Sequence, residues 1–372
     1  MKKLITIIGI LGIILIISIY FINKKQTQKK TVLQKAPIAN KQNSTPFETL
    51  PIIEQKDNAA IEILPAMDSV STAKNQVWAG AFQLVWNDLI NDINKGPILF
   101  EGSQPEMANL LNKSSFSVKD LSADSYYKKC GLVSPKLKQE IEEAIWTKFK
   151  EKSRILDNFN WDPAPEKYIL YVMLKKDLEY IEKFNKLDDD YFEGINSPIK
   201  YFGITTDNYS KSKDTIQVLF YNNSNDFAVT LQSKQGDLIH LYRTNNKKTL
   251  AEFYSEMKQK SNAKKDYLRA EDKFKAPVLD FNAQREFKEL YNKKIMPSEF
   301  KIDRAIEAIQ FKMDEVGVKL IAQSIISVGR RAALASRDFY FTGPYIIFME
   351  EPGKQPYFAA YITDPSALNG NN

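Results

Sequence analysis

The N-terminus constrains this chain more than any other part of its sequence. Residues 4–22 are 19 consecutive residues without a charge, and a pair of lysines bounds them on either side. A helix of about 20 apolar residues spans a bilayer, whereas the apolar core of a cleaved signal peptide is about 7–15 residues long. The run therefore predicts a transmembrane signal-anchor over residues 1–23, with secretion after signal cleavage as the alternative.

The net charge of +6 has its origin in the same region. Residues 1–35 contain seven of the 52 Lys and Arg residues and no acid, which leaves 45 basic residues against 46 acidic ones in the rest. Because the body has no basic excess, we expect no nucleic-acid partner. More lysines follow the apolar run than precede it, which favours a cytoplasmic body, but long domains are translocated largely regardless of such charges. We therefore expect the body on the extracytoplasmic side.

The scarcity of cysteine and histidine excludes several kinds of site. The chain has one Cys, Cys130, and one His, His240, so it has neither an internal disulfide framework nor a site with two imidazoles. It also lacks a Gly-rich phosphate loop, H-E-x-x-H and G-x-S-x-G. We expect no enzyme activity, no metal and no cofactor. We interpret His240 as structural and the acidic run 188–190 as a solvated loop.

The rest of the chain divides by composition and periodicity. Residues 24–74 are rich in Gln, Asn, Lys, Thr and Pro and predict a polar stalk that leads to a body over residues 75–372. The body shows no regular alternation of strands and helices, which indicates an α+β fold. Apolar periodicity predicts helices over 75–93, 134–152, 247–260 and 282–294, and strands over 167–174, 214–221, 226–232, 275–281 and two runs after 340.

Two stretches near the C-terminus match motifs of a known family. The stretch 301–324 resembles the serpin segment that leads, through a strand, into the reactive-centre loop, and 339–365 resembles the C-terminal serpin hairpin. Upstream, 81–89, 226–257 and 275–295 resemble earlier serpin elements in the same order. The matching residues near the C-terminus are Ile302, Ala305, Ile306, Ala308, Met313, Asp314, Glu315, Gly317, Phe339, Pro344, Tyr345, Ile347, Phe358, Ala360 and Pro365.

The resemblance is good over residues 220–368 and weak over 76–219. It implies a serpin-like fold, with a large central β-sheet, helices and an exposed reactive-centre loop. In inhibitory serpins a protease attacks this loop as a substrate. The cleaved loop then inserts into the sheet as a new strand and traps the acyl-enzyme, so the serpin needs no catalytic residue of its own.

The family's spacing implies where the loop is cut. The reactive-centre bond falls at Arg331–Ala332, with Arg330 as the alternative scissile residue. A carboxylate-lined specificity pocket pairs with a guanidinium, so the implied partner is a trypsin-like serine protease. The loop hinge implied by the resemblance consists of Glu315, Gly317, Val318, Lys319, Leu320, Ile321 and Ala322.

The hinge sequence itself allows two conformations. Alternate residues from Val318 to Val328 are nearly all apolar, as in a strand with one face on the core. Val318, Ile321, Ile325 and Val328 also share one face of a helix, the state found in some non-inhibitory serpins.

The large side chains of the hinge argue against inhibition. Leu320 and Ile321 stand where inhibitory hinges carry small residues, and overfilling a packed sheet costs about 1–3 kcal/mol. The alternative function is therefore a non-inhibitory serpin-fold protein with a binding or structural role in the cell envelope. A third interpretation, an anchored protein unrelated to serpins, would lack a large five-stranded sheet with a long exposed loop near 318–338.

Overall fold

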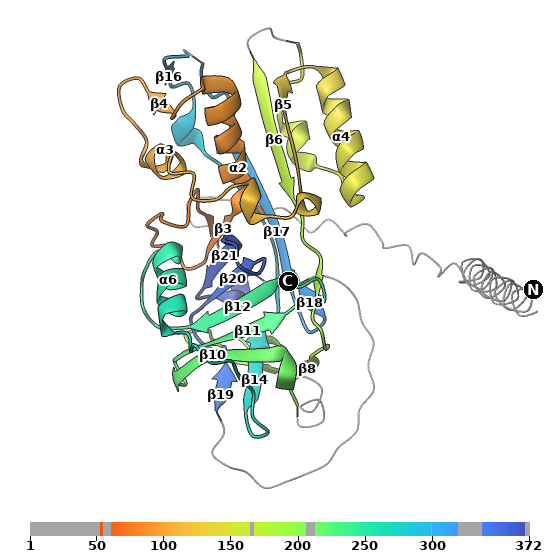
Figure 1. Ribbon diagram of the computed structural model, residues 1–372, viewed down its shortest axis with the longest axis vertical. Coiled ribbons are helices and arrows are strands. Elements are labelled where there is room, and N and C mark those ends of the chain that lie inside the picture. The colour runs from red at the N-terminus through yellow and green to blue at the C-terminus, as the bar shows by residue number, and fades with distance from the viewer. Residues whose placement is uncertain are drawn as a thin grey trace, which may run out of the picture. The chain divides into compact units, whose positions relative to one another are not determined.

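The computed structural model describes residues 53–54, 61–163, 167–205, 213–298, 300–318 and 337–368 (Figure 1). The chain divides into two units, Met1–Thr49 and Leu50–Asn372, and the first lies entirely outside the described residues. The predicted signal-anchor lies there too. Within the described ranges, no helix has the length and apolar character needed to cross a membrane.

Four α-helices and 21 short or medium strands make up the described part of the chain. The helices are α2 (Gly80–Asp88), α3 (Glu106–Leu111), α4 (Pro135–Phe149) and α6 (Leu250–Lys260), with a π-helix over Leu89–Asn94 and 3-10 helices over Val118–Asp120, Ala123–Ser125, Arg154–Asn158, Lys213–Thr215, Lys288–Leu290 and Pro365–Leu368. The strands are β1 (Ile53–Glu54), β2 (Glu62–Ile63), β3 (Gln76–Ala79), β4 (Leu99–Phe100), β5 (Tyr126–Leu132), β6 (Tyr168–Leu174), β7 (Leu178–Glu179), β8 (Asn185–Asp190), β9 (Ile199–Gly203), β10 (Ile216–Asn223), β11 (Asp226–Gln232), β12 (Leu238–Arg243), β13 (Asp266–Tyr267), β14 (Lys273–Pro277), β15 (Leu279–Glu286), β16 (Ile295–Met296), β17 (Ile306–Met313), β18 (Gly317–Val318), β19 (Asp338–Tyr340), β20 (Tyr345–Glu350) and β21 (Pro356–Ile362).

The largest sheet has eight strands in the order β13-β10-β11-β12-β20-β21-β3-β2. All its pairs are antiparallel except β2 with β3, so the sheet is mixed. Every residue of β20 and β21 is buried, which makes this hairpin the centre of the core. The strands predicted over 214–221 and 226–232 and after 340 are confirmed, as is the helix over 247–260, which Thr249 caps.

Smaller sheets surround this core. Three strands form the order β1-β15-β17, and four form β19-β14-β9-β8. Strands β5 and β6 form an antiparallel pair, although α4 lies between them in the chain. As Figure 1 shows, α4 lies on one face of this pair, and the three elements share a small apolar core around Ile141 and Ile145. Ser134 caps α4 by accepting a hydrogen bond from the Leu137 amide (3.2 Å).

The folded unit reaches further toward the N-terminus than the predicted body. Ile53–Glu54 pairs with β15, and Ile61, Ile63 and Leu64 are almost completely buried, although residues 53–74 belong to the predicted stalk. The apolar stretch 61–64 is short and follows polar residues, so composition alone does not predict that it is buried. It is held in place by the parallel pairing of β2 with β3, which the local sequence does not reveal.

Three local predictions need correction. The predicted helix 75–93 begins as strand β3, because Val77 and Trp78 pair with β21 in the core. The predicted helix 282–294 begins as the end of β15, because its register against β17 overrides the helical pattern, and its helical part is the 3-10 turn Lys288–Leu290. The acidic run 188–190 lies on strand β8 rather than in a loop, and Asp190 pairs with Lys275 (2.5 Å).

The large sheet and the helices expected for a serpin-like fold are confirmed. The strand before the predicted loop, β17, nevertheless belongs to the three-stranded sheet, and β5–β6 forms a separate pair. Among the described strands no sheet has five members. On the described part of the chain, β17 therefore pairs with β15 and with no strand on its outer edge.

Candidate functional site

The chain reverses direction directly after β17. The Asp314 amide donates to the Gly317 carbonyl (3.1 Å), and Asp314 Oδ1 accepts from the Val316 amide (2.9 Å). This tight turn sends Gly317–Val318 back as β18, antiparallel to β7. We call residues 314–318 the N-terminal anchor, because they precede the predicted loop. Three predicted hinge residues, Glu315, Gly317 and Val318, lie in it.

Backbone groups hold the N-terminal anchor against β7 and the residues after it. The Tyr180 amide donates to the Val316 carbonyl (3.0 Å), and the Phe184 amide donates to the Glu315 carbonyl (2.8 Å). A Cβ on Gly317 would collide with the Leu178 carbonyl, so this approach requires glycine. Val318 is 5% exposed and lies on strand β18, as the strand alternation predicts, while the other residues of the helical alternative, Ile321, Ile325 and Val328, lie outside the described residues.

Two buried carboxylates accompany this turn. Asp314 and Glu315 are almost completely buried, and each has one lysine nearby: Lys312 Nζ lies 3.4 Å from Asp314, and Lys186 Nζ lies 3.6 Å from Glu315. Burial raises the pKa of Tyr180 well above its ordinary value, and the two carboxylates raise it further. The turn therefore combines backbone hydrogen bonds with two buried acids, each in an ion pair with a lysine.

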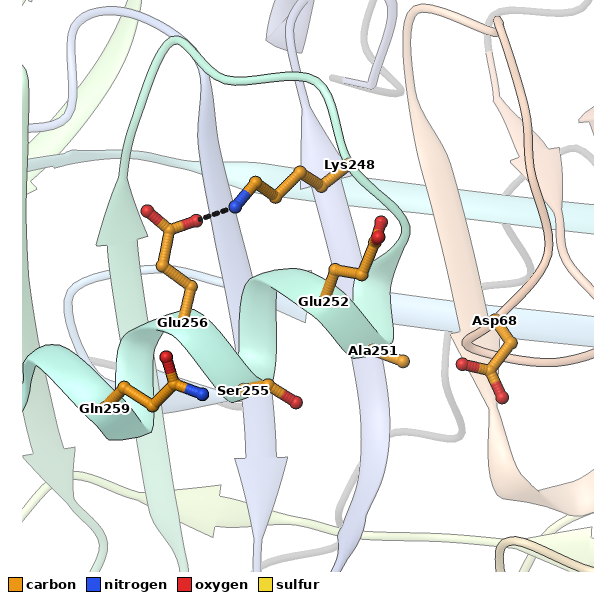
Figure 2. Close-up of a pocket in the computed structure, with 7 residues that line it drawn as sticks. All are labelled: Asp68, Lys248, Ala251, Glu252, Ser255, Glu256 and Gln259. Atoms are coloured by element: carbon orange, nitrogen blue, oxygen red, sulfur yellow. Dashed lines mark ion pairs between the residues drawn. The ribbon is translucent and has the colours of Figure 1, made fainter.

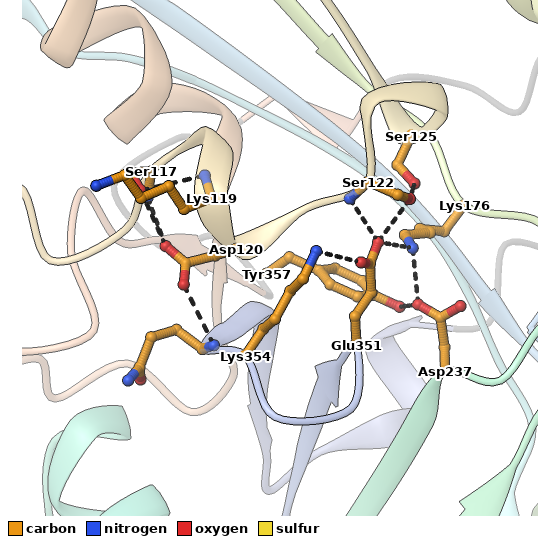
Figure 3. A network of polar contacts seen from close by, with 11 residues as sticks. Ser117, Lys119, Asp120, Ser122, Ser125, Lys176, Asp237, Glu351, Lys354 and Tyr357 are labelled. Atoms are coloured by element: carbon orange, nitrogen blue, oxygen red, sulfur yellow. Dashed lines mark hydrogen bonds and ion pairs between the residues drawn. The ribbon is translucent and has the colours of Figure 1, made fainter.

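A polar network lies behind β7 (Figure 3). Lys176 is largely buried and lies 2.7 Å from Asp237 and 2.6 Å from Glu351, with its ammonium 4.9 Å from the centre of the Tyr357 ring. The Tyr357 hydroxyl donates to Asp237 (3.1 Å). Since Lys176 lies two residues before Leu178, the network fixes the strand that receives β18.

Glu351 is the acceptor on which most of this network converges. It accepts from Lys176, from the Ser122 amide (2.8 Å) and from Lys354 (2.8 Å). Burial by itself raises the pKa of this carboxyl, but the lysines and Ser122 outweigh burial and lower it to about 2. A hollow of about 600 Å³ opens beside the network, and Leu178 is part of its wall.

The other end of the predicted loop is held by side-chain charges. The Arg337 guanidinium lies 2.7 Å from Asp272 Oδ2 and 2.8 Å from Asp266 Oδ2, and Asp272 is almost fully buried. The Arg337 side chain also packs on Phe339 and donates to the Tyr267 carbonyl (3.2 Å). We call Arg337 and strand β19 the C-terminal anchor.

A second buried arginine secures the residues that follow this anchor. Arg243 donates to the Tyr340 carbonyl (2.5 Å), Thr342 Oγ1 (2.9 Å) and Asn225 Oδ1 (3.0 Å). Burial lowers the pKa of its guanidinium, and Glu193, 3.4 Å away, opposes this effect. The sequence offers no local signal for either arginine, because their partners are remote in the chain.

Two other polar groupings lie away from the anchors. His240 lies 2.8 Å from Thr230 Oγ1 and 3.2 Å from Glu350, but all three residues are buried in the eight-stranded sheet, in agreement with a structural role for His240. A shallow groove of about 390 Å³ runs beside α6 (Figure 2). Its acids are already engaged, Glu256 by Lys248 (3.0 Å) and Glu252 by the helix cap at Thr249 (2.8 Å).

The remaining predicted residues lie outside the described part of the chain. They are the hinge residues Lys319, Leu320, Ile321 and Ala322, the reactive-centre pair Arg331 and Ala332, and the alternative Arg330. Within the described residues, no group of three or more His, Cys, Asp or Glu is arranged to hold a metal ion.

The similarity of this chain to known proteins is one of structure, at low sequence identity. No family model and no curated protein matches the chain. Serpin48, a highly specific serpin of the insect Tenebrio molitor, is 11% identical with a TM-score of 0.48, over 78% of this chain and 92% of its own. Human thyroxine-binding globulin is 10% identical with a TM-score of 0.44, over 76% and 95%. A second structure of that globulin, with thyroxine bound, is 9% identical with a TM-score of 0.43, over 76% and 96%.

These solved structures are serpins. At identities of 9–11% and TM-scores below 0.5, the likeness concerns the chain trace alone and assigns no function to this protein.

Proposed function

We propose that this chain is a serpin-like inhibitor that traps a trypsin-like serine protease. The protease cleaves the segment between the two anchors as a suicide substrate. The observation that carries the proposal is the N-terminal anchor, which turns the chain back beside β17 and pairs Val318 with Leu178. The outer edge of β17 has no strand partner among the described residues, so a cleaved segment has an unpaired edge to join.

The C-terminal anchor supports the position of the scissile bond. Arg337 is bound by Asp272 and Asp266 and largely buried, so it is a poor substrate residue. Of the arginines after the hinge, Arg330 and Arg331 remain. Because the apolar run 4–22 has the length of a membrane span, we place the inhibitor at the membrane, with its body on the extracytoplasmic side.

The second candidate is a non-inhibitory serpin-fold protein that binds or supports other components of the cell envelope. Two observations favour it. Leu320 and Ile321 are bulkier than the residues of inhibitory hinges. The β5–β6 pair is also separate from β15–β17 among the described strands. A segment that joined the edge of β17 would therefore have no described strand to pair with on its other edge.

Trypsin distinguishes the two functions. The full chain in detergent is mixed with trypsin and run on a denaturing gel, together with Arg331→Glu, Arg330→Glu and the exposed control Arg154→Glu. An inhibitor gives a band near the summed mass that survives boiling, which Arg331→Glu abolishes and Arg154→Glu leaves intact. Cleavage between the anchors without this band contradicts inhibition and favours the binding protein.

A further inference from the structure

The strand before the predicted loop carries an acid on its core face. Glu307, Ile309, Phe311 and Met313 alternate along β17 and are all buried. Glu307 is 4% exposed, and within the described part of the chain neither of its carboxyl oxygens makes a hydrogen bond of good geometry, although the Phe82 amide approaches the carboxyl. A buried polar group without partners is costly, and an ionised one is far more costly.

The charged group that faces Glu307 from the neighbouring strand is already engaged. Arg285 on β15 is its register partner. The Arg285 guanidinium donates to Glu62 Oε1 (3.1 Å), to the Ile63 carbonyl (2.7 Å) and to Glu289 Oε1 (2.9 Å). Arg285 therefore attracts the Glu307 carboxylate without neutralising it.

The start of α2 also lies close to Glu307. The N-cap residue of this helix, Ala79, offers no side-chain cap, and its first turn holds no acid. The Phe82 amide is close enough to Glu307 to lower its pKa, as is Arg285. Burial dominates both effects and raises the pKa of Glu307 to about 8.

We propose that Glu307 is a proton-dependent element that sets how firmly β17 is held against β15. While the carboxyl is protonated, β17 stays packed in the core. When it ionises, β17 loosens, because an unneutralised charge then faces the core from a strand with one partner on the described part of the chain. This inference goes beyond the proposed inhibition and does not depend on it.

The direction of the pH effect follows from proton linkage. The folded chain keeps the Glu307 proton over the range in which an unfolded chain has lost it, from about 4.5 to about 8. The folded state is therefore penalised progressively as the pH rises through this range. At most, the unfolding equilibrium constant changes tenfold per pH unit, which amounts to about three orders of magnitude over this pH range.

The experiment compares the full wild-type chain with Glu307→Gln, which is neutral at every pH, and with Glu106→Gln, an exposed acid at the start of α3. Thermal unfolding is measured from pH 5 to pH 9. We expect the midpoint of Glu307→Gln to rise relative to wild type as the pH increases, and Glu106→Gln to stay parallel to wild type. Parallel curves for wild type and Glu307→Gln would overturn the proposal.

A second measurement needs no variant, in case Glu307→Gln does not fold. Hydrogen exchange of the wild-type chain is followed by mass spectrometry over the same pH range and corrected for the intrinsic exchange rate. We expect peptides covering β17 to lose protection between pH 6 and pH 9, while peptides covering β11 keep theirs. Equal behaviour of the two strands contradicts a device centred on Glu307.

Discussion

The two anchors of the predicted loop are built from different interactions. The N-terminal anchor depends on backbone hydrogen bonds, the close approach of Gly317 to β7 and the burial of Val318. The C-terminal anchor depends on a largely buried arginine, Arg337, between two aspartates. Backbone pairs can be exchanged for equivalent pairs with another strand, whereas a buried charge released from its partner has no substitute. We infer that the C-terminal anchor is fixed and that the N-terminal anchor is the end that can rearrange.

Removal of Arg337 is expected to have the largest effect. Arg337→Ala leaves Asp272, whose side chain is 1% exposed, without its guanidinium partner. Breaking a buried pair from one side costs about 3–5 kcal/mol, and we expect a loss of this size in chemical denaturation. The control is Arg269→Ala, whose side chain is 63% exposed and 4.0 Å from Asp266; its expected loss is about 0.5 kcal/mol. Equal losses for both variants would contradict a fixed C-terminal anchor.

Acid is expected to weaken the support of the N-terminal anchor. Hydrogen bonds lower the pKa of Glu351 to about 2 in the folded state, below its ordinary value of 4.5. Its stabilisation is therefore fully present above pH 4.5 and is lost as the pH falls toward 2, to an extent of about 3 kcal/mol. Denaturation measured from pH 6 to pH 2 should show this decline.

A matched variant assigns that decline to Glu351. Glu351→Gln is expected to be less stable than wild type at pH 6 and to lose less on acidification, since its amide does not titrate. Glu101→Gln, which changes an exposed acid, serves as the control. If Glu351→Gln lost as much stability on acidification as wild type, Glu351 would not be the cause of the decline.

Filling the space at Gly317 is expected to have a smaller and local effect. In Gly317→Ala the added Cβ collides with the Leu178 carbonyl, and we expect β18 to separate from β7 at a cost of about 1–3 kcal/mol. Hydrogen exchange at Leu178 and at Tyr180, whose amide donates to the Val316 carbonyl, should accelerate, with β19 unchanged. Gly96→Ala is the control, because no atom lies within 4 Å of its added Cβ. Unchanged exchange at β7 would show that β18 does not need this close approach.

The smallest effect is expected at Lys186. Its side chain is 76% exposed and its ammonium lies 3.6 Å from Glu315, so solvent screens the pair. Lys186→Ala should lower the free energy of unfolding by about 0.5 kcal/mol, as measured by chemical denaturation. A loss above about 2 kcal/mol would mean that side-chain charge holds the N-terminal anchor after all.

The sequence predicted the parts of this molecule that depend on short-range patterns. The strands β10 and β11 and the inward position of Val318 follow from local rules. It failed where distant pairing decides the outcome, as in the strand at 282–286 and the buried Ile61. The same reason explains why Arg337 was missed: Asp266 and Asp272 lie more than 60 residues away.

The most direct test of the difference between the anchors is hydrogen exchange before and after trypsin cleaves the segment between them. If the N-terminal anchor rearranges and the segment joins β17, the amides of β17 should gain protection and the apparent melting temperature should rise, while β14 and β19 stay unchanged. If β17 gains no protection after cleavage, or if β19 loses its own, the proposed roles of the two anchors are contradicted.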